Sequence, residues 1–254
     1  MSFLKSLCSA FLMYSGIPMP QIEWKEENRR YSLCFFPLVG VVIGVLVMLW
    51  YYACEASGIG KMLFSAGAAA IPVLVTGGIH LDGFCDVCDA KACLGSREKM
   101  LEVMSDSRVG AFAVIKLILY FLIQIGLFSE TKSFEMIAVC AFGFVQSRAW
   151  SGLAAVSFKS AKSDGALQSF RKPADRNITV LTEIVYLTVS AFFMLRISLL
   201  TGAAAVVGGA AAFVYYRIFS YKKFGGITGD LAGYFLQICE LSIMFFAVMA
   251  EVIF

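Results

Sequence analysis

Charged residues are scarce in this sequence. Only 15% of its 254 residues are Asp, Glu, Lys or Arg, and 59% are hydrophobic, whereas soluble domains average about a quarter charged and roughly half apolar. No polar stretch is long enough to form a soluble domain beside the apolar ones. The formal net charge of +3 is small for a protein that binds nucleic acid. These shortages indicate one transmembrane domain, residues 1–254, whose partner is the lipid bilayer and not a nucleic acid.

Histidine is almost absent, and the cysteines do not form the pattern of a disulfide framework. Four of the eight cysteines fall within or beside apolar runs, where cysteine behaves as a small hydrophobe: Cys34, Cys54, Cys140 and Cys239. A zinc site built from the single histidine, His80, and the nearby Cys85, Cys88 and Cys93 is an alternative. It is a weak one, because a lone CxxC is a loose signal.

Seven apolar windows are long enough to cross a bilayer as helices. A hydrocarbon core of about 30 Å takes about 20 residues of α-helix. We therefore predict an all-α, polytopic integral membrane protein with about seven transmembrane helices, preceded by a cytoplasmic or interfacial segment, residues 1–32, whose apolar start is an interfacial or re-entrant helix. The windows are residues 33–53, 62–81, 111–128, 136–158, 180–195, 197–216 and 231–254.

Lysine and arginine predict the orientation of these helices, because cytoplasmic loops carry an excess of both. Sixteen of them lie in the N-terminal segment and in the connections after the second, fourth and sixth windows. The other side holds three, Lys61, Lys132 and Arg196. The N-terminus and those three connections are therefore predicted to face the cytoplasm.

The connection after the second window carries three carboxylates, Asp82, Asp86 and Asp89, in the run GGIHLDGFCDVCD. On a helix, at about 100° per residue, they fall within an arc of roughly 60°. No basic residue appears among them before Lys91. Such a cluster of oxygen ligands is typical of a site for a hard cation. The alternative is a solvated acidic helix end at the membrane surface.

The same connection contains a second motif, MSDSRVG, just before the third window. Asp106 could add a ligand to a second cation, while the guanidinium of Arg108 could hold a phosphate through two parallel hydrogen bonds. The alternative is a structural one, in which Ser105 or Asp106 caps the following helix. These residues alone do not decide between the two.

A glycine-rich turn, FGGITGDLAG, opens the last window. Glycine lets the backbone approach a ligand closely, and the N-terminus of a helix offers N–H groups to a phosphate. Asp230 could orient a cation or a hydroxyl there. Asp230 as a simple helix cap is the competing interpretation.

Charged residues inside the apolar windows need partners or water, and four of them are considered as site candidates. Lys116 and Glu183 are near the ends of their windows, so we expect them to extend toward the membrane surface. Arg148 and Glu240 lie deeper and could pair with each other or line a cavity. Glu240 is on that ground a candidate substrate contact.

Together the three motifs resemble the cobalamin synthases, also named adenosylcobinamide-GDP ribazoletransferases. The run GGIHLDGFCDVCDA is similar to the family's GGLHLDGLADTADG, and MSDSRVGAF and GGITGDLAGYFLQICE follow in the family's order. The N-terminal run FLMYSGIP is also similar, with Ser15-Gly16 where the family usually has Thr-Arg. Ala90 replaces a glycine that is usual in the family.

The resemblance implies a Mg²⁺-dependent membrane enzyme with its active site on the cytoplasmic face of the cell membrane. Such an enzyme joins a corrinoid nucleotide, adenosylcobinamide-GDP, to α-ribazole or its 5'-phosphate, forming adenosylcobalamin or its phosphate and releasing GMP. A displacement at a pyrophosphate needs cations, a phosphate clamp and a base. We expect these roles for Asp82, Asp86 and Asp106 (metal), Asp89 (base or second metal ligand), Arg108 (clamp), His80 (second candidate base), and Thr228, Gly229 and Asp230 (closing the pocket from the opposite side).

Other functions are compatible with parts of the sequence. A lipid phosphotransferase of the CDP-alcohol type also carries spaced aspartates at a membrane surface, but its Asp-Gly-Ala-Arg pattern is not present here. A cation transporter using Arg148, Glu183 and Glu240 would usually show internal repeats, and none is evident. A membrane scaffold would leave the three acidic motifs unexplained. The sequence leaves the oligomeric state open, including a homo-oligomer.

Overall fold

The chain is helical in a computed structural model, which describes residues 2–163 and 165–253. Met1, the start of the predicted N-terminal segment, and Phe254, the end of the last window, lie outside the described residues. No strand is present in the described part, so the predicted all-α class is confirmed. The helices are α1 (Ser2–Tyr14), α2 (Glu26–Arg29), a 3₁₀ turn (Leu33–Phe35), α3 (Phe36–Ser57), α4 (Lys61–Thr76), α5 (Ile79–Ala92), α6 (Arg97–Val103), α7 (Ala111–Ser129), α8 (Phe134–Ser157), α9 (Ala166–Arg171), α10 (Arg176–Ile197), α11 (Leu199–Phe224) and α12 (Gly229–Ile253).

Each predicted window corresponds to one of the long helices. Five helical segments in the described chain are long and apolar enough to cross a membrane. They are Glu26–Ser57, which ends with α3, and the helices α7, α10, α11 and α12. Helices α4 and α5 pass the same test together, although they are bent by 97° at the break between them, which gives up to six spans. The protein is thus a polytopic helical membrane protein, and the count of seven spans and the orientation of the N-terminus stay predictions.

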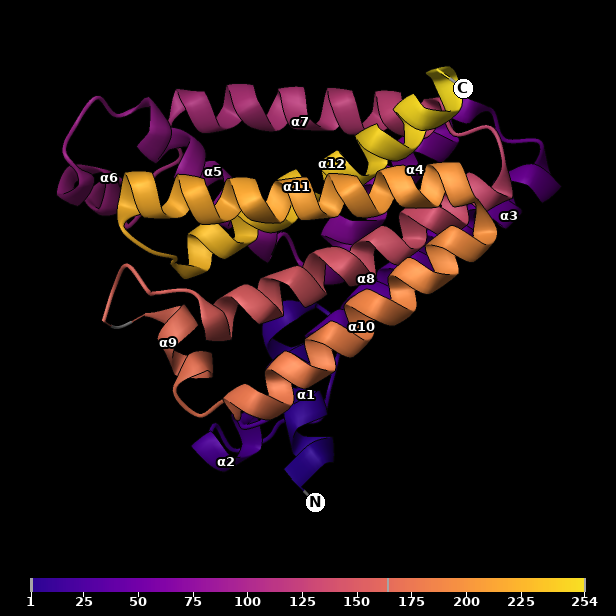
Figure 1. The fold of residues 1–254 in the computed structure, drawn as a ribbon. Coiled ribbons are helices and arrows are strands. Elements are labelled where there is room, and N and C mark those ends of the chain that lie inside the picture. Colours follow the sequence, from indigo (N-terminus) through magenta and orange to yellow (C-terminus); the bar gives the residue numbers. More distant parts are fainter. Residues whose placement is uncertain (1, 164, 254) are drawn as a thin grey trace.

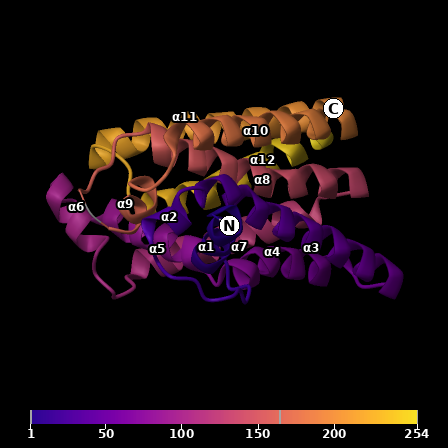
Figure 2. The same cartoon turned by 90° about the horizontal axis from the view of Figure 1, so that it is seen from below.

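The connections differ in length between the two ends of the helix bundle. Figure 1 shows α6, α9 and the α11–α12 loop at one end, and the turns α3–α4, α7–α8 and α10–α11 at the other. The view from below in Figure 2 shows the same arrangement for α6 and α9. The three sequence motifs therefore lie at the end that carries the long connections, as expected for motifs that share one face.

Helices α3 and α8 pack closely because α3 carries glycine at the crossing. A Cβ atom on Gly44 would lie 2.8 Å from the carbonyl oxygen of Ala141, and one on Gly40 would overlap the carbonyl group of Phe144. In a bilayer, small residues allow this approach, and close packing then supplies much of the attraction between helices. The α3–α8 pair forms one side of the apolar core.

A buried ion pair joins α8 to α12. The Arg148 Nη1 atom donates to Glu240 Oε1 at 2.6 Å, and Ser147 Oγ donates to the same oxygen at 3.3 Å. Arg148 is 1% exposed and Glu240 4%. Of the two alternatives for these residues, the structure shows pairing.

The structure contradicts the expectation that Glu183 extends toward the membrane surface. Lys116 is exposed, as expected, but Glu183 is 0% exposed and lies against Gly152 of α8. Neither of its carboxyl oxygens has a hydrogen-bond partner among the described residues. The expectation was wrong because position 183 faces the neighbouring helix, and a helix end alone does not say which side faces outward.

Gly40→Ala should destabilise the protein, because the added methyl group forces α3 away from the Phe144 carbonyl. A matched control is Gly126→Ala in α7, where no described atom lies within 4 Å of the added Cβ. The control should gain up to about 1 kcal/mol from the better helix propensity of alanine. Thermal unfolding in detergent would measure both variants. Equal behaviour of the two would contradict the proposed tight crossing.

Reversing one charge of the Arg148–Glu240 pair should lower stability severely, since breaking a buried pair costs about 3–5 kcal/mol. The double variant Arg148→Glu with Glu240→Arg should unfold at a higher temperature than either single variant. If the double variant were no more stable than the single ones, the pair would not be an energetic unit.

Candidate active site

Two glycines between α4 and α5 set the direction of the acidic helix. Gly77 and Gly78 have φ values of +65° and +81°, which glycine adopts at little steric cost. The break bends the two helices by 97°. As a result α5 leaves the axis of α4 and turns its first residues toward α12. The three carboxylates of the first motif, Asp82, Asp86 and Asp89, therefore lie on one helix, as predicted.

Helices α5 and α12 cross at a second pair of glycines. A Cβ atom on Gly83 would lie 2.8 Å from the Asp230 Cα atom, and one on Gly233 would lie 2.9 Å from the carbonyl oxygen of His80. The two backbones are therefore in direct contact. This crossing brings together the first and third sequence motifs, which are more than 140 residues apart.

A cavity of about 290 Å³ lies beside this crossing. Asp82 of α5 and Asp230 of α12 both line it, next to Gly229. The predicted site residues His80, Asp82, Gly229 and Asp230 are thus gathered around one space. Its other walls come from α1, α3, α8 and α9, through residues that include Tyr14, Phe36, Ser151 and Phe170.

Thr228 rather than Asp230 caps α12. The Leu231 N–H donates to Thr228 Oγ1 at 3.2 Å, and Thr228 is 4% exposed. Capping by a threonine hydroxyl satisfies one of the unpaired N–H groups at the helix start. The alternative that Asp230 only caps this helix is therefore wrong, and its carboxylate lies at the cavity.

Asp86 belongs to the same acidic group. It is half-buried, and Asp82 and Asp230 are close enough to act on its carboxylate electrostatically. No side chain in the described part of the protein donates a hydrogen bond to Asp82 or Asp86. Carboxylates held together without donors suit a cation with oxygen ligands. As placed, however, no three His, Cys, Asp or Glu residues of the described chain form a group that could hold a metal ion.

Lys162 is a basic residue at the site that the sequence did not single out. Its Nζ atom donates to Ser105 Oγ at 2.9 Å, and its charge acts on both Asp86 and Asp230. The backbone holds it there, because Ala161 N donates to the Ile227 carbonyl at 2.8 Å. This pairing of the α8–α9 connection with the glycine-rich turn has no signal in the sequence.

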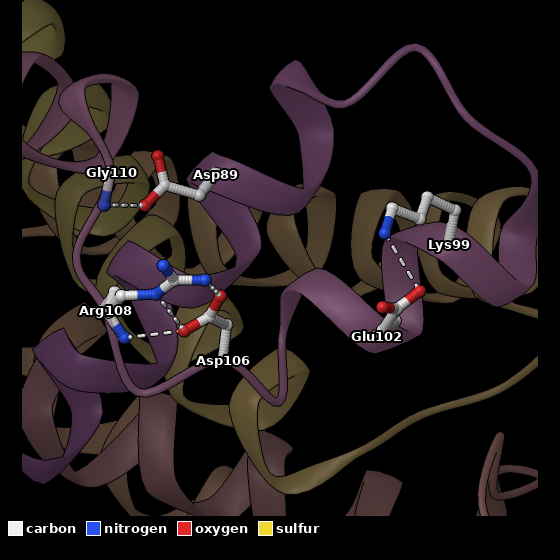
Figure 3. Close-up of polar contacts among 6 residues, drawn as sticks. All are labelled: Asp89, Lys99, Glu102, Asp106, Arg108 and Gly110. Atoms are coloured by element: carbon white, nitrogen blue, oxygen red, sulfur yellow. Dashed lines mark hydrogen bonds and ion pairs between the residues drawn. The ribbon is translucent and has the colours of Figure 1, made fainter.

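Asp89 has a structural role in this conformation. One carboxylate oxygen accepts a hydrogen bond from the Gly110 N–H at 2.6 Å (Figure 3), and the other accepts one from the Ala113 N–H at 2.9 Å, both at the start of α7. The cap of α7 therefore comes from another helix, and neither Ser105 nor Asp106 provides it. The geometry favours this role over that of base or metal ligand, since the carboxylate points to α7.

Asp106 and Arg108 pair with each other. Arg108 Nη2 and Nε donate to the two carboxylate oxygens at 2.8 and 3.0 Å, in an exposed loop (Figure 3). Arg108 and its hydrogen bonds lower the pKa of Asp106 to about 2, so this carboxyl is ionised at neutral pH. Neither residue lines the cavity. A metal and a phosphate would have to separate the pair before either residue could take its predicted role.

The structure separates two residues that were both predicted at the site, His80 and Glu240. His80 lines the cavity, but its Nε2 atom is buried and has no hydrogen-bond partner within the described chain, and its ring packs near Tyr14 and Phe36. Its role as a second candidate base stays a prediction. Glu240 does not reach the cavity, because its carboxylate is paired with Arg148. The predicted substrate contact at Glu240 is therefore corrected to a structural one.

The zinc alternative finds no support in the structure. The eight cysteines are free thiols, and Cys88 is buried. No set of His80 and cysteines among the described residues is arranged as a metal site. Packing is the better account of these cysteines.

The fold and the cavity define the class of protein. It is a multi-pass helical membrane protein with an acidic cavity beside the crossing of α5 and α12. The sequence model of the cobalamin-5-phosphate synthase family matches residues 6–248. The chain belongs to this family.

Relatives support the same assignment. An adenosylcobinamide-GDP ribazoletransferase of Lachnoclostridium phytofermentans is 41% identical over 99% of this chain and 96% of its own length. Proteins of the same name are 31% identical in Listeria monocytogenes, over 97% of this chain and 98% of their own, and 30% in Clostridium perfringens, over 94% and 96%. No solved structure matches the chain.

Asp89→Asn should lower stability by about 1 kcal/mol, because asparagine keeps one acceptor oxygen for two N–H groups. The connection to α7 should also become more sensitive to proteolysis. The control is Asp106→Asn, which breaks an exposed pair and should leave thermal unfolding unchanged. A stable Asp89→Asn variant that had lost only metal-dependent activity would instead favour a ligand role.

Proposed function

We propose that the protein is an adenosylcobinamide-GDP ribazoletransferase, which catalyses the final step of cobalamin assembly. Family membership across nearly the whole chain supports this function. The observation in the structure that carries it is the meeting of Asp82 and Asp230, from two distant motifs, at one cavity. A binding scaffold would not require carboxylates of different helices to converge.

The reaction is a displacement at phosphorus. A hydroxyl of the ribazole attacks the phosphate attached to the cobinamide, a new O–P bond forms, and the P–O–P bond of the pyrophosphate breaks to release GMP. The hydroxyl proton passes to a base. Negative charge develops on the phosphate oxygens and on the leaving group, so positive charge at the site lowers the barrier.

Mg²⁺ fits the donor set of this site. Asp82 and Asp86 would hold it, because no side chain in the described part of the protein donates a hydrogen bond to either of them, and Asp230 of the facing helix lies near by. When bound, the cation would neutralise the charge of the pyrophosphate. Asp89 and Asp106 are weaker candidates for ligands than the sequence implied, because backbone N–H groups and Arg108 already occupy their oxygens.

The remaining roles follow from position. Asp230 faces the cavity beside the start of α12 and is proposed to orient the attacking hydroxyl and receive its proton. Lys162 is half-buried near Asp86 and Asp230 and can neutralise a phosphate there. Arg108 would add a second positive group once it leaves Asp106. Thr228 and Gly229 hold the start of α12 in place and leave its N–H groups open to an anion.

The site is proposed to face the cytoplasm, with the protein in the cell membrane. The end of the bundle that carries the cavity also carries the connections rich in lysine and arginine, among them Lys91, Lys159 and Lys162. Positive charge near the spans is retained on the cytoplasmic side. Nucleotide substrates would reach the site from that side.

Asp82→Asn should abolish product formation while the protein stays folded, because the substitution removes the charge of a proposed metal ligand. The assay follows corrinoid product from adenosylcobinamide-GDP and α-ribazole phosphate in detergent, with Mg²⁺ or with EDTA. The control is Glu130→Gln, which should retain full activity. Glu130 follows the C-terminal end of α7, opposite to the end that Asp89 caps. If well-folded wild type formed no product with any divalent cation, the proposed function would be wrong.

A further inference from the structure

The residues that line the cavity fall into two groups of different chemistry. Asp82, Gly229 and Asp230 form the group that the proposed reaction uses. The second group consists of apolar and aromatic side chains from four helices and the 3₁₀ turn, and the reaction as described does not use it; the part of the cavity beside them is called its apolar end. These residues are Met13, Tyr14, Leu33, Phe36, Leu167, Phe170 and Leu236.

The aromatic side chains form a fixed wall. The Tyr14 ring centroid lies 4.2 Å from that of Phe36 and 5.5 Å from that of Phe170. Phe36 is 3% exposed and Phe170 2%, so their neighbours hold both in place. An arrangement of this kind is rigid before any ligand binds, which reduces the entropy lost on binding.

Polar groups also line the cavity beside these aromatic rings. His80 packs near Tyr14 and Phe36. Tyr14 lines the cavity too, and its hydroxyl forms no hydrogen bond with any residue that the structure describes. A phenol can donate one hydrogen bond, and a buried phenol usually has a partner. The apolar end therefore suits a flat aromatic ligand that carries one hydrogen-bond acceptor.

Size narrows the choice between the two substrates. Small-molecule sites usually enclose about 300–1,000 Å³, and this cavity, at about 290 Å³, is at the lower limit. It has room for a nucleoside but not for a corrin macrocycle with its side chains. The ribazole is a nucleoside whose base, a dimethylbenzimidazole, is flat and apolar. One ring nitrogen of this base is free of the sugar and can accept a hydrogen bond.

We propose that the apolar end of the cavity binds the benzimidazole base of the ribazole, with the Tyr14 hydroxyl donating to the free ring nitrogen. The sugar then points to Asp82 and Asp230, where its hydroxyl meets the phosphate. The corrinoid stays outside and presents only its pyrophosphate to the acidic end. This inference rests on the proposed function, because that function supplies the ligand.

The first experiment reduces the volume of the cavity. Ala232, on α12, lines the cavity and is partly exposed to it, so Ala232→Leu should fill part of the space. Ala203→Leu, at a partly exposed position of α11 away from the cavity, is the matched control. Direct binding of α-ribazole, by equilibrium dialysis, and the KM of each substrate are measured for both variants and wild type.

Ala232→Leu should weaken α-ribazole binding and raise its KM roughly 10- to 200-fold, the usual effect of a poorly fitting apolar group. The KM for adenosylcobinamide-GDP should not change, and the control should match wild type. A rise in the corrinoid KM alone, or no change in either, would overturn the proposal. If wild type binds α-ribazole but forms no product, the proposed function fails while the subsite stands.

A second experiment needs no change in packing. Wild type should bind α-ribazole about tenfold more tightly than the analogue in which the free ring nitrogen is replaced by C–H, the usual effect of one hydrogen bond. Tyr14→Phe keeps the ring and should abolish this preference. A preference that persisted in Tyr14→Phe would assign the ring nitrogen to another partner and contradict the role of Tyr14.

Discussion

The close approach of α5 and α12 is the constraint on which the site depends. Gly83 and Gly233 leave no side chain between the two backbones, so Asp82 and Asp230 face the same cavity. The bend at the double glycine before α5 gives this helix the direction it needs to reach α12. A larger residue at either crossing position would separate the carboxylates without altering any of them.

The charged side chains of this protein differ in whether they have a close partner. Two of the charged groups that support the fold have close partners, Arg148 in Glu240 and Asp89 in the N–H groups of α7. Asp82 and Asp86 are held near each other without donors. Placing like charges together costs free energy unless a cation is bound. The contrast separates carboxylates that stabilise the structure from those available to a ligand.

The sequence predicted the helical class, each long helix and the three motifs, because apolar length and residue spacing are local properties. It also predicted that Asp82 and Asp230 share a site, through the family resemblance. It could not predict that Asp89 caps a helix 21 residues further on, or that Lys162 reaches the acidic group, because both depend on contacts between distant segments. Glu183 shows the same limit: near a helix end, spacing alone does not say which side is buried.

The exposed Asp106–Arg108 pair has a consequence for turnover. While the two residues bind each other, their loop is electrically neutral and has little attraction for a lone phosphate. If Arg108 binds the pyrophosphate as proposed, each catalytic cycle must open this pair and then close it again. Re-formation of the pair competes with GMP for the guanidinium, so the aspartate would hasten the departure of the product and limit inhibition by free nucleotides.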